Sequence, residues 1–144
     1  MAGRIVVFGA IGYTGELTTR ALVERGATPL LAGRDADRVA RLAAELGGLE
    51  STVADVDHPL SVRALVERGD VLVTTVGPYL RFGEPALETV VDTGAHYFDA
   101  TGEGPFIRRG FDDYGARAKR ADCALHGVRV RFRPRQPRQR VGPS

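Results

Sequence analysis

Apolar runs of strand length alternate with helical patterns along the first 125 residues. Four to eight apolar residues in a row predict buried strands, whereas apolar positions spaced three and four apart predict amphipathic helices. The predicted strands cover 4–9, 28–33, 51–56, 70–77 and 96–101. The predicted helices cover 13–25, 35–47, 58–69, 84–94 and a last stretch over about 105–121. Pro near helix starts and Gly just after helix ends support these bounds.

This alternation is typical of an α/β fold with a doubly wound parallel sheet. Continuous apolar strands indicate burial on both faces, so we expect helices to cover both faces of the sheet. Because crossovers between parallel strands are right-handed, the first strand should lie centrally and the expected strand order is 3-2-1-4-5. The sequence therefore predicts a single N-terminal half of a Rossmann-type fold over residues 1–125, followed by a tail over 126–144.

The heptapeptide RALVERG occurs twice, at 20–26 and 63–69, each time just before a predicted strand. We interpret both copies as helix ends in which Leu and Val pack inward and Gly turns the chain. Seven residues are too few to establish a duplication.

A glycine-rich turn, GAIGYTG, joins the first strand to the first helix. Its G-x-x-G-x-x-G spacing is a variant of the dinucleotide-binding fingerprint, and the strand–turn–helix context gives it weight. Gly9 permits the tight turn, Gly12 lets a pyrophosphate approach the backbone, and Gly15 lets the helix pack closely on the strand. The anion would then meet free N–H groups at the positive end of the helix dipole. The expected cofactor-binding residues of the turn are Gly9, Ala10, Gly12, Tyr13, Thr14 and Gly15.

The residues after the second strand bear on the choice of cofactor. NAD-preferring sites usually place an acidic residue there to accept from the ribose 2′-OH. Here Arg34 comes first, and its guanidinium can hold a 2′-phosphate, so NADP(H) is favoured over NAD. Asp35 is either a ribose acceptor or the N-cap of the next helix.

Further candidates follow the third and fourth strands. Asp55 lies where an adenine ring would stack and either accepts from its amino group or is a capping or solvated carboxylate. Gly77 and Pro78 either form a stiff lip at the carboxyl edge of the sheet, where open α/β sheets bind ligands, or belong to an ordinary β-to-α loop. Tyr79 and His96 are the only candidates for proton donors, and loop or packing roles suit both better. We therefore assign no catalytic residue and no metal ligand.

Composition and charge limit the alternatives. Hydrophobic residues make up 43% and charged residues 26%, which is a globular composition. The apolar run at the N-terminus is too short and too rich in glycine for a membrane span or a signal peptide. The single Cys123 excludes an intramolecular disulfide and fits a reducing cytoplasm.

The formal net charge of +2 is unevenly distributed. The tail contains six arginines and no acidic residue, so the rest of the chain carries a charge of −4. A mildly acidic body argues against nucleic-acid binding, although a basic arm that binds nucleic acid or anionic lipid remains an alternative for the tail. The alternating VRVRFR segment is a second alternative as a sixth edge strand, and the remainder should be disordered.

Several motifs together resemble the NADP-binding domain of the saccharopine dehydrogenase-like family, in particular the actinobacterial branch that includes trans-acting enoyl reductases of lipid biosynthesis. They are GAIGYTG, LAGRD, ADVD, VGPYLRFGEP and GAHYFDATGE, and the likeness covers about residues 4–125. The resemblance implies a pyrophosphate on the three glycines, a 2′-phosphate near Arg34 and adenine near Asp55. It implies that Gly77 and Pro78 lie near the nicotinamide, with Asp99, Gly102 and Glu103 at a cleft between domains. One departure is Ile11, where the family usually has Thr.

The family continues into a second domain that carries substrate contacts and usually part of a dimer interface, so a homodimer is possible. In this chain the tail begins instead. Codons can be chosen for His126 to Gln139 that, read one base later, encode TAFGFDFVPGNLAS, a segment like that of the family. We therefore expect that the chain leaves the family's reading frame close to Leu125.

These observations favour an NADP(H)-binding domain of an oxidoreductase that transfers hydride, as the resemblance implies, to or from a small or lipid-linked substrate. The alternatives are a non-catalytic NADP(H) sensor and an inactive fragment.

Overall fold

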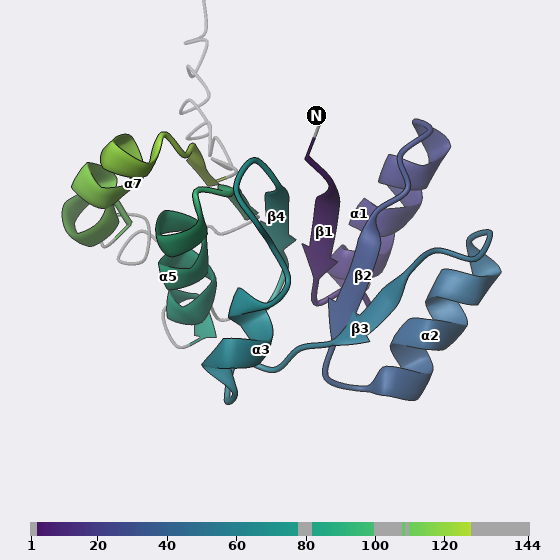
Figure 1. Cartoon of the computed structure of the whole chain (residues 1–144). Coiled ribbons are helices and arrows are strands. Elements are labelled where there is room, and N and C mark those ends of the chain that lie inside the picture. Colours follow the sequence, from purple (N-terminus) through teal and green to yellow (C-terminus); the bar gives the residue numbers. More distant parts are fainter. Residues whose placement is uncertain (1–2, 78–81, 100–107, 109, 128–144) are drawn as a thin grey trace, which may run out of the picture.

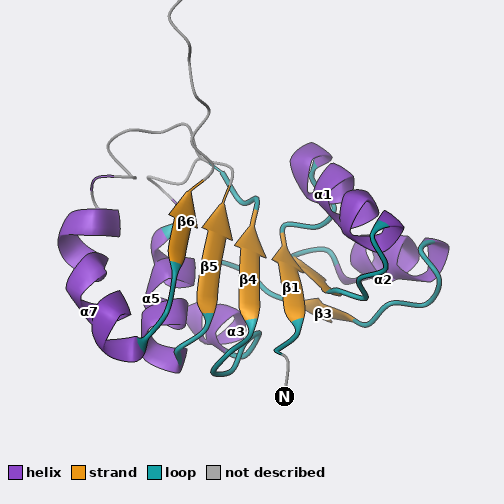
Figure 2. Cartoon of the chain, turned by 90° about the horizontal axis from the view of Figure 1, so that it is seen from above, coloured by secondary structure: helices purple, strands orange, loops and turns teal. Residues whose placement is uncertain are grey.

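The computed structural model describes residues 3–77, 82–99, 108 and 110–127. It contains a six-stranded, fully parallel sheet in the order β3-β2-β1-β4-β5-β6 (Figure 1 labels β1 to β4, and Figure 2 labels β5 and β6). The strands are β1 (Ile5–Phe8), β2 (Leu30–Gly33), β3 (Ser51–Val53), β4 (Val71–Thr74), β5 (His96–Asp99) and β6 (Leu125–Gly127). The predicted Rossmann-type fold and the order 3-2-1-4-5 are confirmed, and β6 adds a strand beside β5.

Helices cover both faces of this sheet (Figure 2). They are α1 (Tyr13–Glu24), α2 (Ala36–Glu45), α3 (Pro59–Arg63), α5 (Glu84–Thr93) and α7 (Gly115–Ala121), the last preceded by the π-helical turn η1 (Gly110–Tyr114). The longest helix in the described ranges has 12 residues, and none there is long and apolar enough to cross a bilayer.

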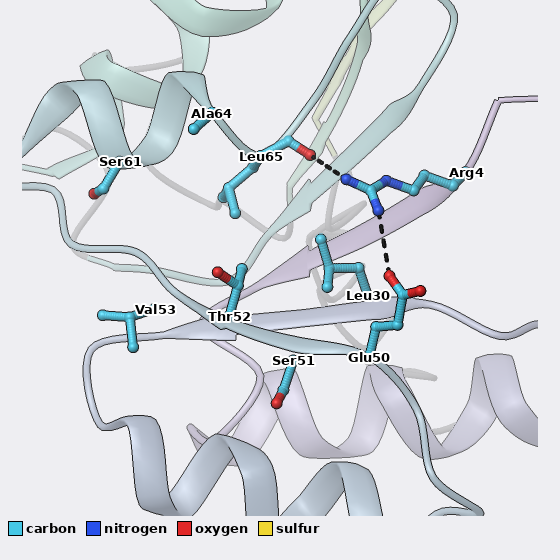
Figure 3. Close-up of a pocket in the computed structure, with 9 residues that line it drawn as sticks. All are labelled: Arg4, Leu30, Glu50, Ser51, Thr52, Val53, Ser61, Ala64 and Leu65. Carbon is cyan, nitrogen blue, oxygen red and sulfur yellow. Dashed lines mark hydrogen bonds and ion pairs between the residues drawn. The ribbon is translucent and has the colours of Figure 1, made fainter.

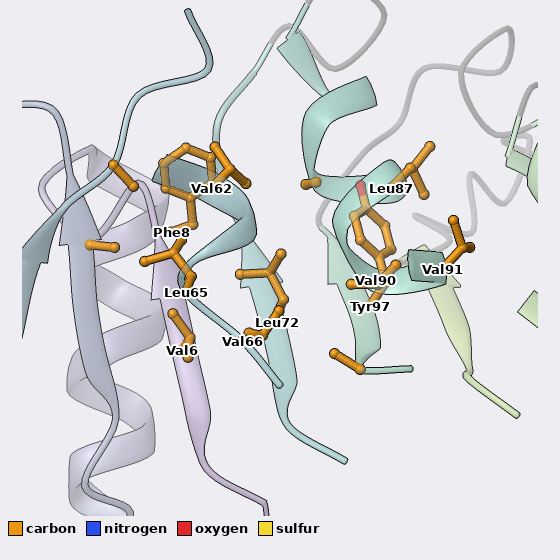
Figure 4. Packing of buried hydrophobic residues seen from close by; sticks show 14 of the residues in the cluster. Val6, Phe8, Val62, Leu65, Val66, Leu72, Leu87, Val90, Val91 and Tyr97 are labelled. Carbon is orange, nitrogen blue, oxygen red and sulfur yellow. The ribbon is translucent and has the colours of Figure 1, made fainter. Parts of the chain in front are cut away.

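The pleat of β1 divides the core into two clusters. Val7 points to one face and packs with apolar residues of β2 and α2. Val6 and Phe8 point to the other face, where they pack with α3, α5 and their neighbours (Figure 4). Successive side chains alternate between the faces of a strand, so the uninterrupted apolar run of β1 fills both clusters. This burial fixes β1 at the centre of the sheet, and with it the turn that follows Phe8.

The structure corrects two predictions. The helix predicted over 58–69 ends at Arg63, because the following residues form turns rather than a continued helix. The third strand ends at Val53 and all three of its residues are exposed, since β3 is the edge strand of the sheet. Burial on both faces therefore holds for the central strands and not for β3. The VRVRFR segment lies outside the described residues.

Candidate functional site

A cleft of about 1060 Å³ lies at the carboxyl edge of the sheet. Its walls come from the segments that follow four neighbouring strands, β1, β2, β3 and β4. Ligands of open α/β sheets bind at this edge, where the crossovers before and after the central strand diverge. Of the predicted binding residues, five line the cleft: Gly9, Gly12, Arg34, Asp55 and Gly77.

Close packing holds the glycine turn in place. Gly9 has a φ of 86°, and a Cβ there would lie 2.7 Å from the hydroxyl oxygen of Thr75. A Cβ on Gly15 would lie 1.9 Å from the carbonyl oxygen of Gly9, so only glycine lets α1 approach β1 this closely. A Cβ on Gly12 would meet nothing nearer than 3.6 Å. Gly12 therefore leaves open space beside the backbone, whereas Gly9 and Gly15 serve the packing.

The amino end of α1 opens on the cleft. Gly12 is its N-cap and makes no side-chain cap, and the amide of Glu16 donates to the Gly12 carbonyl at 2.8 Å. Glu16 is thus the first residue whose amide has a partner within the helix. The amides of Tyr13, Thr14 and Gly15 have no intrahelical acceptor. They carry the positive end of the helix dipole, which favours an anion at this point.

Four of the predicted binding residues do not line the cleft with their side chains. Ala10 is fully buried, and its amide donates to the carbonyl of Ala32 at 3.2 Å. Tyr13 and Thr14 are exposed, with the Tyr13 side chain 84% accessible. Gly15 is buried against Gly9. Gly15 can thus contribute to anion binding only through its backbone amide, whereas side-chain or backbone hydrogen bonds from Tyr13 and Thr14 stay a prediction.

Sequence reasoning missed the role of Thr75. Its hydroxyl donates to the carbonyls of Phe8, at 3.2 Å, and Gly9, at 3.0 Å, and so ties the end of β4 to the glycine turn. The sequence does show a small hydroxyl residue just after the fourth strand. Its contact with the glycine turn can be inferred only when the fourth strand is known to lie beside the first.

The segment after β2 forms a charged wall of the cleft. Arg34, Asp35 and Arg38 line it together with Gly33. The carboxylate of Asp35 accepts from the amide of Arg38 at 3.1 Å, so Asp35 is the N-cap of α2. The capping interpretation is confirmed, and Arg38 is a cleft residue that the sequence reasoning did not identify.

Asp55 is oriented by a local turn after β3. Its carboxylate accepts from the amide of Asp57 at 2.9 Å, and its own amide donates to the hydroxyl of Ser61. Both aspartates line the cleft. One oxygen of the Asp55 carboxylate is therefore hydrogen-bonded within the turn.

An apolar wall lies after β4, where Val76, Gly77 and Phe82 line the cleft. Pro78 and Tyr79 lie outside the described residues, as do Gly102 and Glu103. Asp99 is buried at the end of β5 and accepts from the hydroxyl of Tyr97 at 2.5 Å.

His96 is remote from the cleft because it begins β5 at the opposite edge of the sheet. Its Nδ1 accepts from the amide of Ala124 at 2.9 Å, which supports the packing role predicted for it.

A second hollow of about 560 Å³ lies between β3 and α3 (Figure 3). One end is closed by Arg4, whose guanidinium pairs with Glu50 at 3.5 Å and donates to the carbonyl of Leu65 at 3.4 Å. Arg4, Leu30 and Glu50 lie at the amino ends of their strands, away from the glycine turn. This hollow therefore does not include the glycine turn or the amino end of α1.

The fold and the cleft define a Rossmann-type nucleotide-binding domain. Residues 5–125 match the family model described as the saccharopine dehydrogenase NADP binding domain. The chain belongs to this family, whose cofactor is NADP, and the resemblance inferred from its motifs is confirmed.

Relatives and solved structures agree with this assignment. The trans-acting enoyl reductases of Mycobacterium tuberculosis and Mycobacterium ulcerans are each 38% identical in an alignment over 120 residues, and the match covers 79% of this chain. The chain spans only 29% of the length of these relatives.

Among solved structures, saccharopine dehydrogenase from Saccharomyces cerevisiae matches with a TM-score of 0.71 at 15% identity, over 88% of this chain and 27% of that one. The triphenylmethane reductase of Citrobacter sp., solved with NADP(H), matches with a TM-score of 0.63 at 17% identity, over 82% of this chain and 46% of that one. At such identities these two likenesses support the fold alone.

Proposed function

We propose that this chain binds NADP(H) in the cleft at the carboxyl ends of β1 to β4. The observation that carries the proposal is the open backbone at Gly12 beside the unsatisfied first amides of α1. The bridging diphosphate would lie on these amides. The adenosine would extend toward Arg34 and Asp55, and the nicotinamide toward Val76 and Gly77, which line the other parts of the same cleft.

The residues present fit such a ligand in size and chemistry. Cofactor and small-molecule sites commonly measure about 300–1,000 Å³, and this cleft has a volume of about 1060 Å³. Its walls offer main-chain donors, two arginines and an apolar end, which suit a diphosphate, a phosphorylated ribose and an uncharged ring. When bound, NADP(H) supplies hydride chemistry, and the protein supplies binding and orientation.

We further propose that the domain serves a reductase that acts on enoyl groups, as the name of the trans-acting enoyl reductases suggests. The described residues that line the cleft include no His, Tyr or Lys. We therefore assign these residues to cofactor binding and not to proton transfer. The substrate contacts would come from the part of the relatives that this chain does not match.

Calorimetry and turnover together test the proposal. The full 144-residue chain should bind NADPH, and bind it more tightly than NADH. Consumption of NADPH with enoyl thioesters would support a complete reductase, and binding without turnover would support a cofactor-binding unit or the alternative of a sensor. Folded protein that binds neither nucleotide would contradict the proposal.

The extent and setting of the domain are also proposals. We place the NADP-binding unit within 1–125 and regard 126–144 as a tail outside the family's reading frame. The single Cys123 supports a cytoplasmic location. A homodimer is proposed only on the resemblance to a family that usually forms one, and the acidic body argues against nucleic acid as a partner.

A further inference from the structure

Two arginines near the start of α2 line the same wall of the cleft. Arg34 directly follows β2, and Arg38 lies in the first turn of α2. Both residues are exposed. Two guanidinium groups on one wall suit a doubly charged phosphate, because each offers several donors in a planar fork.

Asp35 caps the amino end of α2, the helix that carries Arg38. It has the extended backbone of an N-cap, with φ −95° and ψ 100°, and its carboxylate accepts from the amide of Arg38 at 3.1 Å. In NAD-preferring sites a carboxylate at this strand end accepts from the ribose hydroxyls. Here the carboxylate instead fixes the main chain at the residue whose side chain lines the cleft.

Two glutamates near Arg38 already pair with another arginine. A small neighbouring hollow, which Arg38 also borders, is lined by Glu16, Glu45 and Arg41. Glu16 and Glu45 pair with Arg20 at 2.9 and 2.7 Å. In the described part of the chain, neither Arg34 nor Arg38 forms an ion pair, so their positive charge remains available to a ligand.

We propose that Arg38 is a second ligand of the 2′-phosphate of NADP(H), beside Arg34, and that Asp35 is a positioning residue that holds Arg38 in place through the helix cap. This inference rests on the proposed function. It assigns Asp35 a role in NADP selectivity that is opposite to that of a ribose-binding carboxylate.

The first test compares ligands that differ only in the 2′-phosphate, using calorimetry on the full chain. Arg38→Ala should weaken NADPH and adenosine 2′,5′-bisphosphate by about 10- to 100-fold, because a hydrogen-bonded charge pair is lost. NADH and AMP, which lack this phosphate, should change by less than about twofold. Arg38→Lys should retain part of the affinity, since it keeps the charge without the fork.

Arg41→Ala is the matched control. Arg41 lies on the same helix and is exposed, but it lines the neighbouring hollow and not the cleft. Its removal should change the affinity for all four ligands by less than about twofold.

The second test concerns Asp35 and compares two neutral replacements. Asn caps helices well and Ala does not, so Asp35→Asn keeps the cap that Asp35→Ala removes. If Asp35 positions Arg38, the ratio of NADPH affinity to NADH affinity should be lower in Asp35→Ala than in Asp35→Asn. Thermal melts monitored by circular dichroism identify any variant that fails to fold. If Arg38→Ala or Asp35→Ala does not fold, the comparison of NADPH with NADH is made on Arg38→Lys or Asp35→Asn instead.

An equal loss of NADPH and NADH in Arg38→Ala, or no loss, would overturn the assignment of Arg38. Equal affinity ratios in the two Asp35 variants, or a higher ratio in Asp35→Ala, would overturn the positioning role. In both cases the wild-type chain still binds NADPH and the proposed function stands. A folded wild-type chain that binds neither nucleotide overturns the proposed function and this inference with it.

Discussion

The main-chain amide of Arg4 donates to the carboxylate of Asp70 at 3.0 Å, across 66 positions of sequence. The second oxygen of Asp70 accepts from the amide of Glu67 at 2.9 Å. This buried carboxylate therefore joins the residue before β1 to the turn before β4. It satisfies two backbone donors that the sheet and the helices do not.

Asp70→Ala should lower the free energy of unfolding by about 2–4 kcal/mol, because two backbone donors lose a charged acceptor. Urea denaturation followed by circular dichroism measures the change. Asp112→Ala, at an exposed acid of η1, is the control and should stay within about 0.5 kcal/mol of wild type. Equal stability of the two variants would show that the Asp70 contacts are unimportant.

Gly15→Ala should destabilise the fold by about 3 kcal/mol, because overpacking moves a backbone that cannot yield locally. The obstacle is the Gly9 carbonyl oxygen, which would lie 1.9 Å from the new Cβ. Thermal and urea melts would measure the effect. A variant as stable as wild type would contradict the close approach of α1 to β1.

Gly12→Ala should separate binding from folding. The new methyl group would have its nearest neighbour at 3.6 Å, so the cost is only that of a poorer N-cap, and stability should fall by no more than about 1 kcal/mol. The same methyl group would occupy the open space beside the first amides of α1, and the affinity for NADPH should drop by at least about tenfold. Calorimetry would detect this loss, and unchanged affinity would place the diphosphate elsewhere.

Tyr114 should ionise only at strongly alkaline pH. Burial raises the pKa of its phenol, and the hydrogen bond to Glu84 and the proximity of Glu88 raise this pKa further. Because the folded-state pKa lies above the unfolded value of about 10, this stabilisation is fully present below that pH and is lost as the pH rises further. Tyr114→Phe should remove a strongly alkaline component of the phenolate absorbance rise, whereas Tyr13→Phe should leave that component intact.

The coding DNA tests the origin of the arginine-rich tail. Downstream of codon 125, an alternate frame should encode a segment like TAFGFDFVPGNLAS and then continue without an early stop. Sequencing of the gene gives the answer directly. An alternate frame that lacks this segment would leave the tail as a genuine part of the protein.

The alternation of strands and helices determined the class of fold and the order of the first five strands, because right-handed crossovers leave few other arrangements. The glycine spacing, the Asp35 cap and the cofactor class were also readable from sequence, since each depends on neighbours along the chain. Arg38 and Thr75 were not identified, because their relation to the cleft depends on which strands become neighbours.

The repeated heptapeptide shows the limit most clearly. At 20–26 its first five residues continue α1 through Glu24, whereas at 63–69 the helix ends at its first residue, Arg63. Because the two heptapeptides have the same residues, they have the same intrinsic helix propensity. The difference in where the helix ends therefore arises from tertiary contacts. The second copy is followed by Asp70, whose carboxylate accepts from the amide of Glu67 and from the amide of Arg4, which lies just before the neighbouring strand β1. Local sequence determined that a chain reversal follows each copy, and only the packing of β1 against β4 decided where the second helix ends.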